Sequence, residues 1–232
     1  MRALLLAAGL GTRLRPLTDH IPKCLVPIHG KPLLDYWLDL LLRSEVECVL
    51  VNTHYLPDAV REFVASSPWQ ARVTLVHEPQ LLGTAGTILH NRSFFESGAF
   101  LVAHSDNLTR FDVSAFLEHH KRRPEGIDIT MMTFDTDAPQ TCGIVEEDAR
   151  GVVRGFHEKV SNPPGSRANA AVYIVEPSVI GFLASLGKEV IDLSTEVIPR
   201  FIGRIWTFHN TGYHRDIGTP ESLLRAEAEF QP

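Results

Sequence analysis

The chain has 232 residues, of which 44% are hydrophobic and 22% charged, and its formal net charge is -6. This length suits one large α/β domain or two small ones, and the composition is that of an ordinary globular protein. The acidic balance argues against a nucleic-acid backbone or an anionic membrane as a partner. An acidic protein that binds anionic ligands has to concentrate its cations locally or recruit a metal ion.

Strand and helix patterns alternate through the first half of the chain. The predicted strands are 3–7, 46–52, 72–78, 99–106 and 127–134. The predicted helices are 31–44, 57–66, 84–92 and 112–123. This repeated order predicts a three-layer α/β/α fold around a doubly wound, mostly parallel, Rossmann-like sheet.

The second half of the chain has a different pattern, with more strands. The predicted strands are 142–148, 151–159, 168–177 and 204–210. Helices are predicted to begin at Pro177, to occupy part of 192–202, and to span 219–230 with Thr219 as the cap. No repeat, low-complexity tract or linker divides the chain, so a single domain is expected.

Cysteine usage and hydropathy indicate the compartment. Cys24, Cys48 and Cys142 are far apart and form no CxxC pair, so neither a disulfide framework nor a zinc knuckle is predicted. The first apolar run is too short for a signal peptide, and no apolar stretch approaches the roughly 20 residues of a membrane span. We therefore expect a cytoplasmic protein.

The first predicted strand leads directly into a glycine-rich loop, "LLLAAGLGTRLRPL" at 4–17. Gly9 and Gly11 fit the start of a dinucleotide-binding fingerprint, but Leu14 stands where its third glycine belongs. The second strand also ends in Asn52 rather than in an acidic residue that would bind a ribose. The loop is therefore not the dinucleotide fingerprint.

The same loop concentrates positive charge. Arg13, Arg15, Lys23 and Lys31 lie within one turn-rich segment that is too long for a simple connection. Glycines let backbone N–H groups approach phosphate oxygens closely, so the segment predicts a phosphate cradle. A solvated basic loop is the alternative.

Residues 6–36, "LAAGLGTRLRPLTDHIPKCLVPIHGKPLLDY", resemble the signature of the sugar-1-phosphate nucleotidylyltransferases, the nucleotide-sugar pyrophosphorylases. Further segments resemble the family's motifs in the family's order: "LLGTAGTI" (81–88), "HSDN" (104–107), "FHEKV" (156–160), "NAAVYIVEP" (169–177) and "YHRDIGTPESLLRA" (213–226). The resemblance covers nearly the whole chain. It implies one domain of the nucleotide-diphospho-sugar transferase type over 1–232, with a nucleotide-binding half at about 1–110, a sugar-binding half at about 111–232, and no C-terminal β-helix.

The reaction that the resemblance implies is attack of a sugar 1-phosphate oxygen on the α-phosphorus of a nucleoside triphosphate, with release of pyrophosphate. The sugar phosphate is already an anionic nucleophile, so catalysis consists of positioning and charge neutralisation. The expected catalytic residues are Arg13, Lys23 and Asp106. Asp106 and Asp216 resemble the two carboxylates that hold Mg²⁺.

The resemblance also assigns the two substrate sites. The residues expected to bind the nucleotide are Leu6, Ala7, Ala8, Gly9, Gly11, Thr12, Arg13, Glu78, Gly83, Thr84 and Ala85. Glu78 or Gln80 would read the base, and the small residues Gly83, Ala85 and Gly86 would leave room for its flat ring. The residues expected to bind the sugar phosphate are Gly143, Glu158, Lys159 and Asn169.

Several positions depart from the family pattern. Ser105 stands where a glycine is usual, His104 where an asparagine is common, Ala171 where a glycine follows "NA", and Val160 where a proline follows "EK". His214 stands near the usual tryptophan. These changes leave the identity of the sugar open.

The L-G-T-A-G form of the motif is most similar to mannose-1-phosphate and heptose-1-phosphate guanylyltransferases, so GTP is the expected nucleotide. The alternatives are a uridylyl- or thymidylyltransferase, for example one acting on N-acetylmuramate 1-phosphate, a transferase acting on another phosphorylated acceptor such as phosphocholine, or a catalytically silent nucleotide-sugar sensor. The expected partners are the nucleoside triphosphate and the sugar 1-phosphate, without nucleic acid or membrane. A homodimer is left open.

Overall fold

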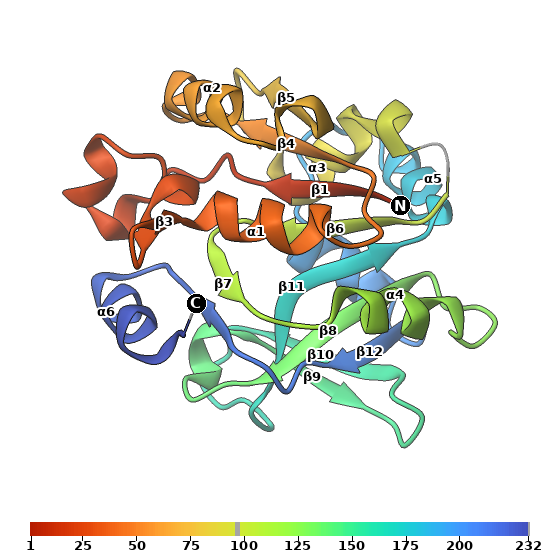
Figure 1. Cartoon of the computed structure of the whole chain (residues 1–232). Coiled ribbons are helices and arrows are strands. Elements are labelled where there is room, and N and C mark those ends of the chain that lie inside the picture. The colour runs from red at the N-terminus through yellow and green to blue at the C-terminus, as the bar shows by residue number, and fades with distance from the viewer. Residues whose placement is uncertain (96–97, 232) are drawn as a thin grey trace. The chain divides into compact units, whose positions relative to one another are not determined.

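The computed structural model describes residues 1–95 and 98–231, which form two compact units (Figure 1). The first unit contains residues 1–81, 103–113 and 212–232, and the second contains 82–102 and 114–211. Neither unit is continuous in sequence, whereas the halves expected from the sequence met at about residue 110. The single-domain assignment stays a prediction.

Parallel strands form the centre of the first unit. Strand β1 (Arg2–Leu6) pairs in parallel with β4 (Cys48–Thr53), and β4 pairs in parallel with β5 (Val73–His77). The three strands are joined by helices, as the alternating pattern predicted. Residues 3–5 and 49–51 are almost fully buried, because strands covered on both faces need continuous apolar runs.

Helices α1 (Leu33–Leu42) and α2 (Pro57–Ser66) pack against β4 and β5, respectively. Helix α1 buries apolar residues at helical spacing, among them Leu34, Trp37, Leu38 and Leu41. The bounds of α2 are those predicted. The helix predicted at 31–44 is shorter at both ends in the structure. It starts later because residues 31–32 form strand β3 and pair with β2 (Pro27–Ile28), and it ends at Leu42.

The C-terminal segment completes the first unit. Helix α6 (Pro220–Glu229, dark blue in Figure 1) begins at a capping box: the Thr219 hydroxyl accepts from the Ser222 N–H, and the Ser222 hydroxyl accepts from the Thr219 N–H. The predicted cap is thus confirmed. Ala226 and Phe230 join a buried cluster with residues from the glycine-rich loop region, including Leu14 and Ile28.

Two further short strands in this unit were not predicted. Strand β7 (Asn107–Thr109) pairs antiparallel with β13 (His214–Asp216), which places Asn107 opposite Asp216. Three residues are too few to show a hydrophobic period. Strand β6 (Phe100–His104) precedes β7, and Ser105 after it donates its N–H to the carbonyl of Leu6 at the end of β1.

The second unit has a mixed sheet. Strands β8 (Ile129–Asp135) and β12 (Ile205–His209) are parallel, whereas β11 (Arg167–Val175) is antiparallel to β8, and β10 (Val153–Glu158) to β9 (Gly143–Glu147). Its helices are α3 (Gly83–His90), α4 (Val113–Lys121) and α5 (Pro177–Ser185). The helical stretch predicted within 192–202 consists of a π-helical turn (Leu193–Val197) and a 3₁₀ turn (Ile198–Arg200).

Candidate active site

The glycine-rich loop after β1 is exposed, and Gly11 fixes its course. Gly11 has φ +63°, and a Cβ there would lie 3.0 Å from Thr18 Cγ2 and 3.2 Å from Lys23 Cβ. The Thr18 hydroxyl donates to the Gly11 carbonyl at 2.7 Å. Only glycine meets both requirements without strain, so the residue is set by the turn itself. Gly9 has open space around it, which leaves its backbone accessible.

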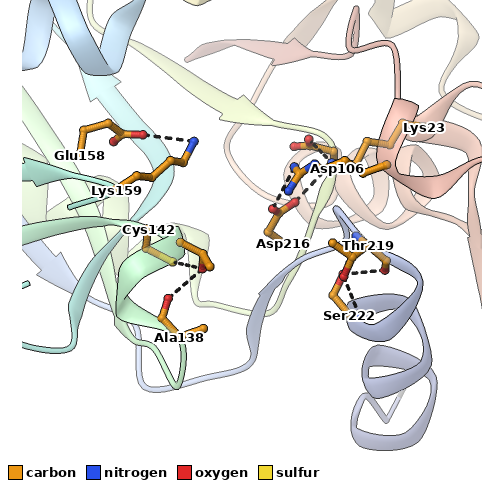
Figure 2. A network of polar contacts seen from close by, with 11 residues as sticks. Lys23, Asp106, Ala138, Cys142, Glu158, Lys159, Asp216, Thr219 and Ser222 are labelled. Carbon is orange, nitrogen blue, oxygen red and sulfur yellow. Dashed lines mark hydrogen bonds and ion pairs between the residues drawn. The ribbon is translucent and has the colours of Figure 1, made fainter. Parts of the chain in front are cut away.

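Lys23 lies between two carboxylates, as Figure 2 shows. Its Nζ is 2.5 Å from Asp106 Oδ2 and 3.3 Å from Asp216 Oδ1, and its side chain is only 8% exposed. Asp106 and Asp216 are 110 positions apart in the numbering, and both were expected to lie at one site. Their shared contact with one nitrogen shows that the fold brings them together.

Two segments that are distant in sequence bring these carboxylates together. Asp106 lies in the turn between β6 and β7, and Asp216 is the last residue of β13. The antiparallel pairing of β7 with β13 aligns them, and the Ile217 N–H donates to the Asp106 carbonyl at 3.0 Å.

Arg13 completes the charged group. Its Nη2 is 3.9 Å from Asp216 Oδ2, and both side chains are more than half exposed. A Cβ at Gly218 would lie 2.8 Å from both of these atoms, so a glycine is needed for the two side chains to approach. Arg13, Lys23, Asp106 and Asp216 thus form one cluster within the first unit.

The surroundings of Asp106 favour its charged form. Burial would raise the pKa of Asp106, but the charges of Lys23 and His104 and the Lys23 hydrogen bond outweigh it and hold the pKa below its usual value. Burial lowers the pKa of His214 to about 3, against the opposing charge of Asp106. His214 is therefore neutral at pH 7 and adds no positive charge.

The predicted base-reading residue Glu78 is 2% exposed. Its Oε1 accepts from Asn52 Nδ2 at 3.0 Å, and Asn52 Oδ1 accepts from the Ala7 N–H at 2.8 Å. These hydrogen bonds, which run from Ala7 through Asn52 to Glu78, anchor the start of the glycine-rich loop to β4. The sequence analysis considered Asn52 only because it stands where a dinucleotide-binding fold has an acidic residue. Its position at the end of a strand was the signal that could have indicated a polar contact. The contact of Glu78 with a base stays a prediction.

In the second unit, the "LGTAG" segment forms the start of α3 and packs against residues 189–193. A Cβ at Gly83 would lie 2.5 Å from the Ile191 carbonyl oxygen, and one at Gly86 would lie 2.3 Å from the Glu189 carbonyl oxygen. The Ala85 and Gly86 N–H groups donate to the Ile191 carbonyl. Close backbone packing is therefore sufficient to explain why these positions are glycines. That they also leave room for a base stays a prediction.

Thr84 belongs to the same contact. Its hydroxyl accepts from the Leu193 N–H at 2.7 Å, and it lies 3.4 Å from Asp192 Oδ2. Asp192 also caps the following π-helical turn through Thr195. Binding of a nucleotide by Gly83, Thr84 and Ala85 stays a prediction.

The predicted sugar residues are also in the second unit. Glu158 lies opposite Gly143 in the β9–β10 pair, and a Cβ at Gly143 would lie 2.7 Å from Glu158 Oε2. Glu158 Oε1 is 3.3 Å from Lys159 Nζ (Figure 2). Lys159 is 65% exposed, so its charge is accessible to a ligand. Asn169 lies on β11, where sequence reasoning overlooked its partner Tyr173.

Residues 2–231 match a family model described as "Nucleotidyl transferase". The chain belongs to the nucleotidyl transferase family. Among the relatives of this family, a mannose-1-phosphate guanylyltransferase from Mycobacterium tuberculosis is 32% identical over 98% of this chain and 64% of that protein. A rice protein described as a mannose-1-phosphate guanylyltransferase is 30% identical, with 63% of its length covered. The chain thus spans somewhat less than two thirds of these curated relatives.

Two solved structures agree with the fold. A Bacillus anthracis protein described as a glucose-1-phosphate thymidylyltransferase, in complex with a sucrose, has a TM-score of 0.89 at 20% identity and is 97% covered, over 100% of this chain. HddC from Yersinia pseudotuberculosis, complexed with GMP-PN, has a TM-score of 0.81 at 25% identity over 99% of both chains. The predicted mostly parallel, Rossmann-like fold class is confirmed.

Two features are absent from the part of the chain that the structure describes. Among residues 1–95 and 98–231, no group of three or more histidine, cysteine, aspartate or glutamate side chains could hold a metal ion. In the same part of the chain, no helix has the length and apolar character to cross a membrane.

Proposed function

We propose that this chain transfers a guanylyl group from GTP to mannose 1-phosphate and releases pyrophosphate. The cluster of Arg13, Lys23, Asp106 and Asp216 carries the proposal, because it places two cations and a carboxylate pair beside an exposed glycine-rich loop. The names of the guanylyltransferase relatives support the base and the sugar. Heptose 1-phosphate, expected from the motif, is the competing acceptor.

The residues of the first unit would bind the triphosphate. The backbone around Gly9 and Gly11 and the Arg13 guanidinium would hold the β- and γ-phosphates, and Lys23 would contact the α-phosphate. These groups offset the repulsion between two anionic substrates, which is the main obstacle to in-line attack. In the second unit, Glu158 would accept hydrogen bonds from the sugar hydroxyls, and the amide of Asn169 would accept and donate them. Lys159 would hold the phosphate of the sugar.

The carboxylate pair fits Mg²⁺. Asp106 and Asp216 supply hard oxygen ligands that already converge on one cationic nitrogen, and two carboxylates with substrate phosphates are the usual protein environment of this ion. When bound, Mg²⁺ would neutralise charge on the phosphates. No third protein ligand is required, because phosphate oxygens and water would complete the coordination.

A pyrophosphate-release assay tests the proposal. The four nucleoside triphosphates are each combined with mannose, heptose, glucose and N-acetylmuramate 1-phosphates in the presence of Mg²⁺. We expect the fastest release with GTP and mannose 1-phosphate, and a loss of at least about a hundredfold in kcat for Arg13→Ala, as for a charge used in the transition state. Absence of release with every pair would contradict the proposal and favour a silent sensor.

A further inference from the structure

Tyr173 on β11 is a buried tyrosine whose hydroxyl has a definite set of partners. The residue is 1% exposed, and its hydroxyl accepts a hydrogen bond from Asn169 Nδ2 at 2.6 Å. The other end of the same amide, Asn169 Oδ1, accepts from the Ala171 N–H at 3.0 Å. Asn169 is thus held at both ends of its amide.

An irregularity of β11 makes this arrangement possible. Asn169 pairs with Thr133 and Tyr173 pairs with Met131, so three residues of β11 stand opposite one residue of β8. Ala171 within this bulge has φ +53°. The bulge brings two residues that are four apart in sequence into side-chain contact, as bulges beside binding sites commonly redirect side chains.

The hydrogen bonds decide how Asn169 faces a ligand. Because the backbone N–H of Ala171 requires an acceptor, Oδ1 must point toward it and Nδ2 must point toward Tyr173. An asparagine amide has two donor hydrogens and an oxygen with two lone pairs. One hydrogen and one lone pair therefore remain, in a fixed orientation, for a sugar hydroxyl.

The surroundings keep the Tyr173 hydroxyl neutral. Burial raises its pKa far above the ordinary value, and the charges of Glu158 and Asp192 raise it further, although hydrogen bonds with Asn169 and Ser194 oppose this. Two predicted sugar-binding residues, Glu158 and Asn169, therefore interact with the same buried phenol.

We propose that Tyr173 is a positioning residue for the sugar 1-phosphate, which acts by fixing the amide of Asn169. Tyr173 itself is too buried to contact the sugar. The inference rests on the proposed function and adds to it a specificity-determining residue that lies behind the binding surface. It explains why a tyrosine, and not any large apolar residue, fits this core position.

Tyr173→Phe tests the inference, because it removes the hydroxyl and keeps the ring. We expect KM for the sugar 1-phosphate to rise about fivefold to tenfold, as for the loss of one ordinary hydrogen bond, while KM for the triphosphate stays within about twofold. Tyr36→Phe is the matched control, since the Tyr36 hydroxyl donates to the Ile28 carbonyl in the first unit. The control should leave both KM values unchanged.

A double-mutant cycle separates positioning from mere support of the fold. In an Asn169→Ala background, Tyr173→Phe should add nothing to KM for the sugar phosphate, because the two residues act as one unit. Equal rises in both KM values, an unchanged sugar KM, or additive effects in the cycle would overturn the inference. An unmodified chain that releases no pyrophosphate would instead contradict the proposed function on which the inference rests.

Discussion

Lys23 places a positive charge between two carboxylates. Its nitrogen contacts both Asp106 and Asp216, and its side chain is largely shielded from water. A metal ion bound by the same two carboxylates would have to displace this nitrogen. Under the proposed function, the lysine would then become available to a phosphate of the substrate.

The first prediction follows from this exchange. Lys23→Met removes the competing cation, so the free variant should bind Mn²⁺ at least about tenfold more tightly than the unmodified chain, because two carboxylates that no longer share a lysine attract a divalent ion more strongly. Titration calorimetry or the Mn²⁺ electron spin resonance signal measures this without turnover. Lys31→Met is the control, because Lys31 pairs with Asp35 and Asp39 instead. Equal or weaker Mn²⁺ binding by Lys23→Met would refute the exchange.

Ala171 provides the second residue-scale prediction. It occupies the position where the resembling motif has a glycine, and its φ of +53° lies in the left-handed region. Ala171→Gly should therefore raise the free energy of unfolding by up to about 1 kcal/mol, since the relief of strain exceeds the entropy that glycine gains in the unfolded chain. Denaturant unfolding measures the change. Ala184→Gly, at an exposed position of α5, should have the opposite sign; a destabilised Ala171→Gly variant would contradict the argument.

At the scale of elements, two helical glycines differ in the space that surrounds them. Gly86 lies in α3 against the Glu189 carbonyl, whereas a Cβ at Gly181 in α5 would meet nothing within 4 Å. Gly86→Ala should destabilise the chain by about 1–3 kcal/mol through overpacking. Gly181→Ala should stabilise it by about 0.5–1 kcal/mol, as alanine does in an open helix. Thermal or urea unfolding of the two variants compares them directly, and equal effects would show that the α3 contact is not limiting.

His120 links three elements of the second unit, and it predicts a pH dependence. The imidazole of this buried residue on α4 is hydrogen-bonded to Thr130 on β8 and to Glu176 at the start of α5. Burial lowers its pKa in the folded state, a shift that the Glu176 hydrogen bond opposes and the charge of Arg123 reinforces. Below the ordinary histidine pKa of about 6.5, the unfolded chain therefore binds the proton more readily than the folded chain.

Stability should accordingly fall as the pH drops from 7.5 to 5.5. His120→Gln should be less stable at pH 7.5, because it loses hydrogen bonds, but its stability should fall less over the same range. Urea unfolding at the two pH values measures both slopes. Identical slopes for the variant and the unmodified chain would show that His120 does not carry this proton.

Sequence reasoning predicted the longer elements well. The parallel strands of the first unit and helix α2 are marked by runs of apolar residues or by helical spacing, and those patterns are set by local geometry. The β7–β13 pair and the three-for-one bulge of β11 were missed, because each is fixed by contacts between distant or irregular segments. The candidate site residues were chosen by their motifs. The position of Lys23 between the two carboxylates could not be predicted from the spacing of these residues in the sequence.

At the scale of the molecule, the first unit depends on residues from the end of the chain. Phe230 is 6% exposed and packs edge-to-face on Tyr36 and Tyr213, with ring centroids 5.4 and 5.3 Å away. The halves expected from the sequence, which meet at about residue 110, place this helix in the second half, because nothing local marks a C-terminal helix as belonging to the first unit. Tyr36, one of the two ring partners of Phe230, lies more than a hundred residues earlier in the chain.

Phe230→Ala should lower the free energy of unfolding by about 3 kcal/mol, as a truncated buried aromatic does. Leu224→Ala on the same C-terminal segment is the control, since Leu224 is 71% exposed and should change stability by no more than about 0.5 kcal/mol. Chemical unfolding followed by tryptophan fluorescence measures both. A tolerated Phe230→Ala would mean that the C-terminal segment contributes little to the first unit.

The pairing of β7 with β13 also imposes an order on synthesis. A ribosome makes Lys23 and Asp106 early, and Asp216 only after the whole second unit has been translated. A nascent chain stalled before residue 212 therefore carries the glycine-rich loop, Lys23 and one carboxylate, but lacks the other carboxylate, strand β13 and helix α6. The charged cluster is completed only when Asp216 has been translated, 110 positions after Asp106, so a nonsense codon anywhere before Asp216 would remove it.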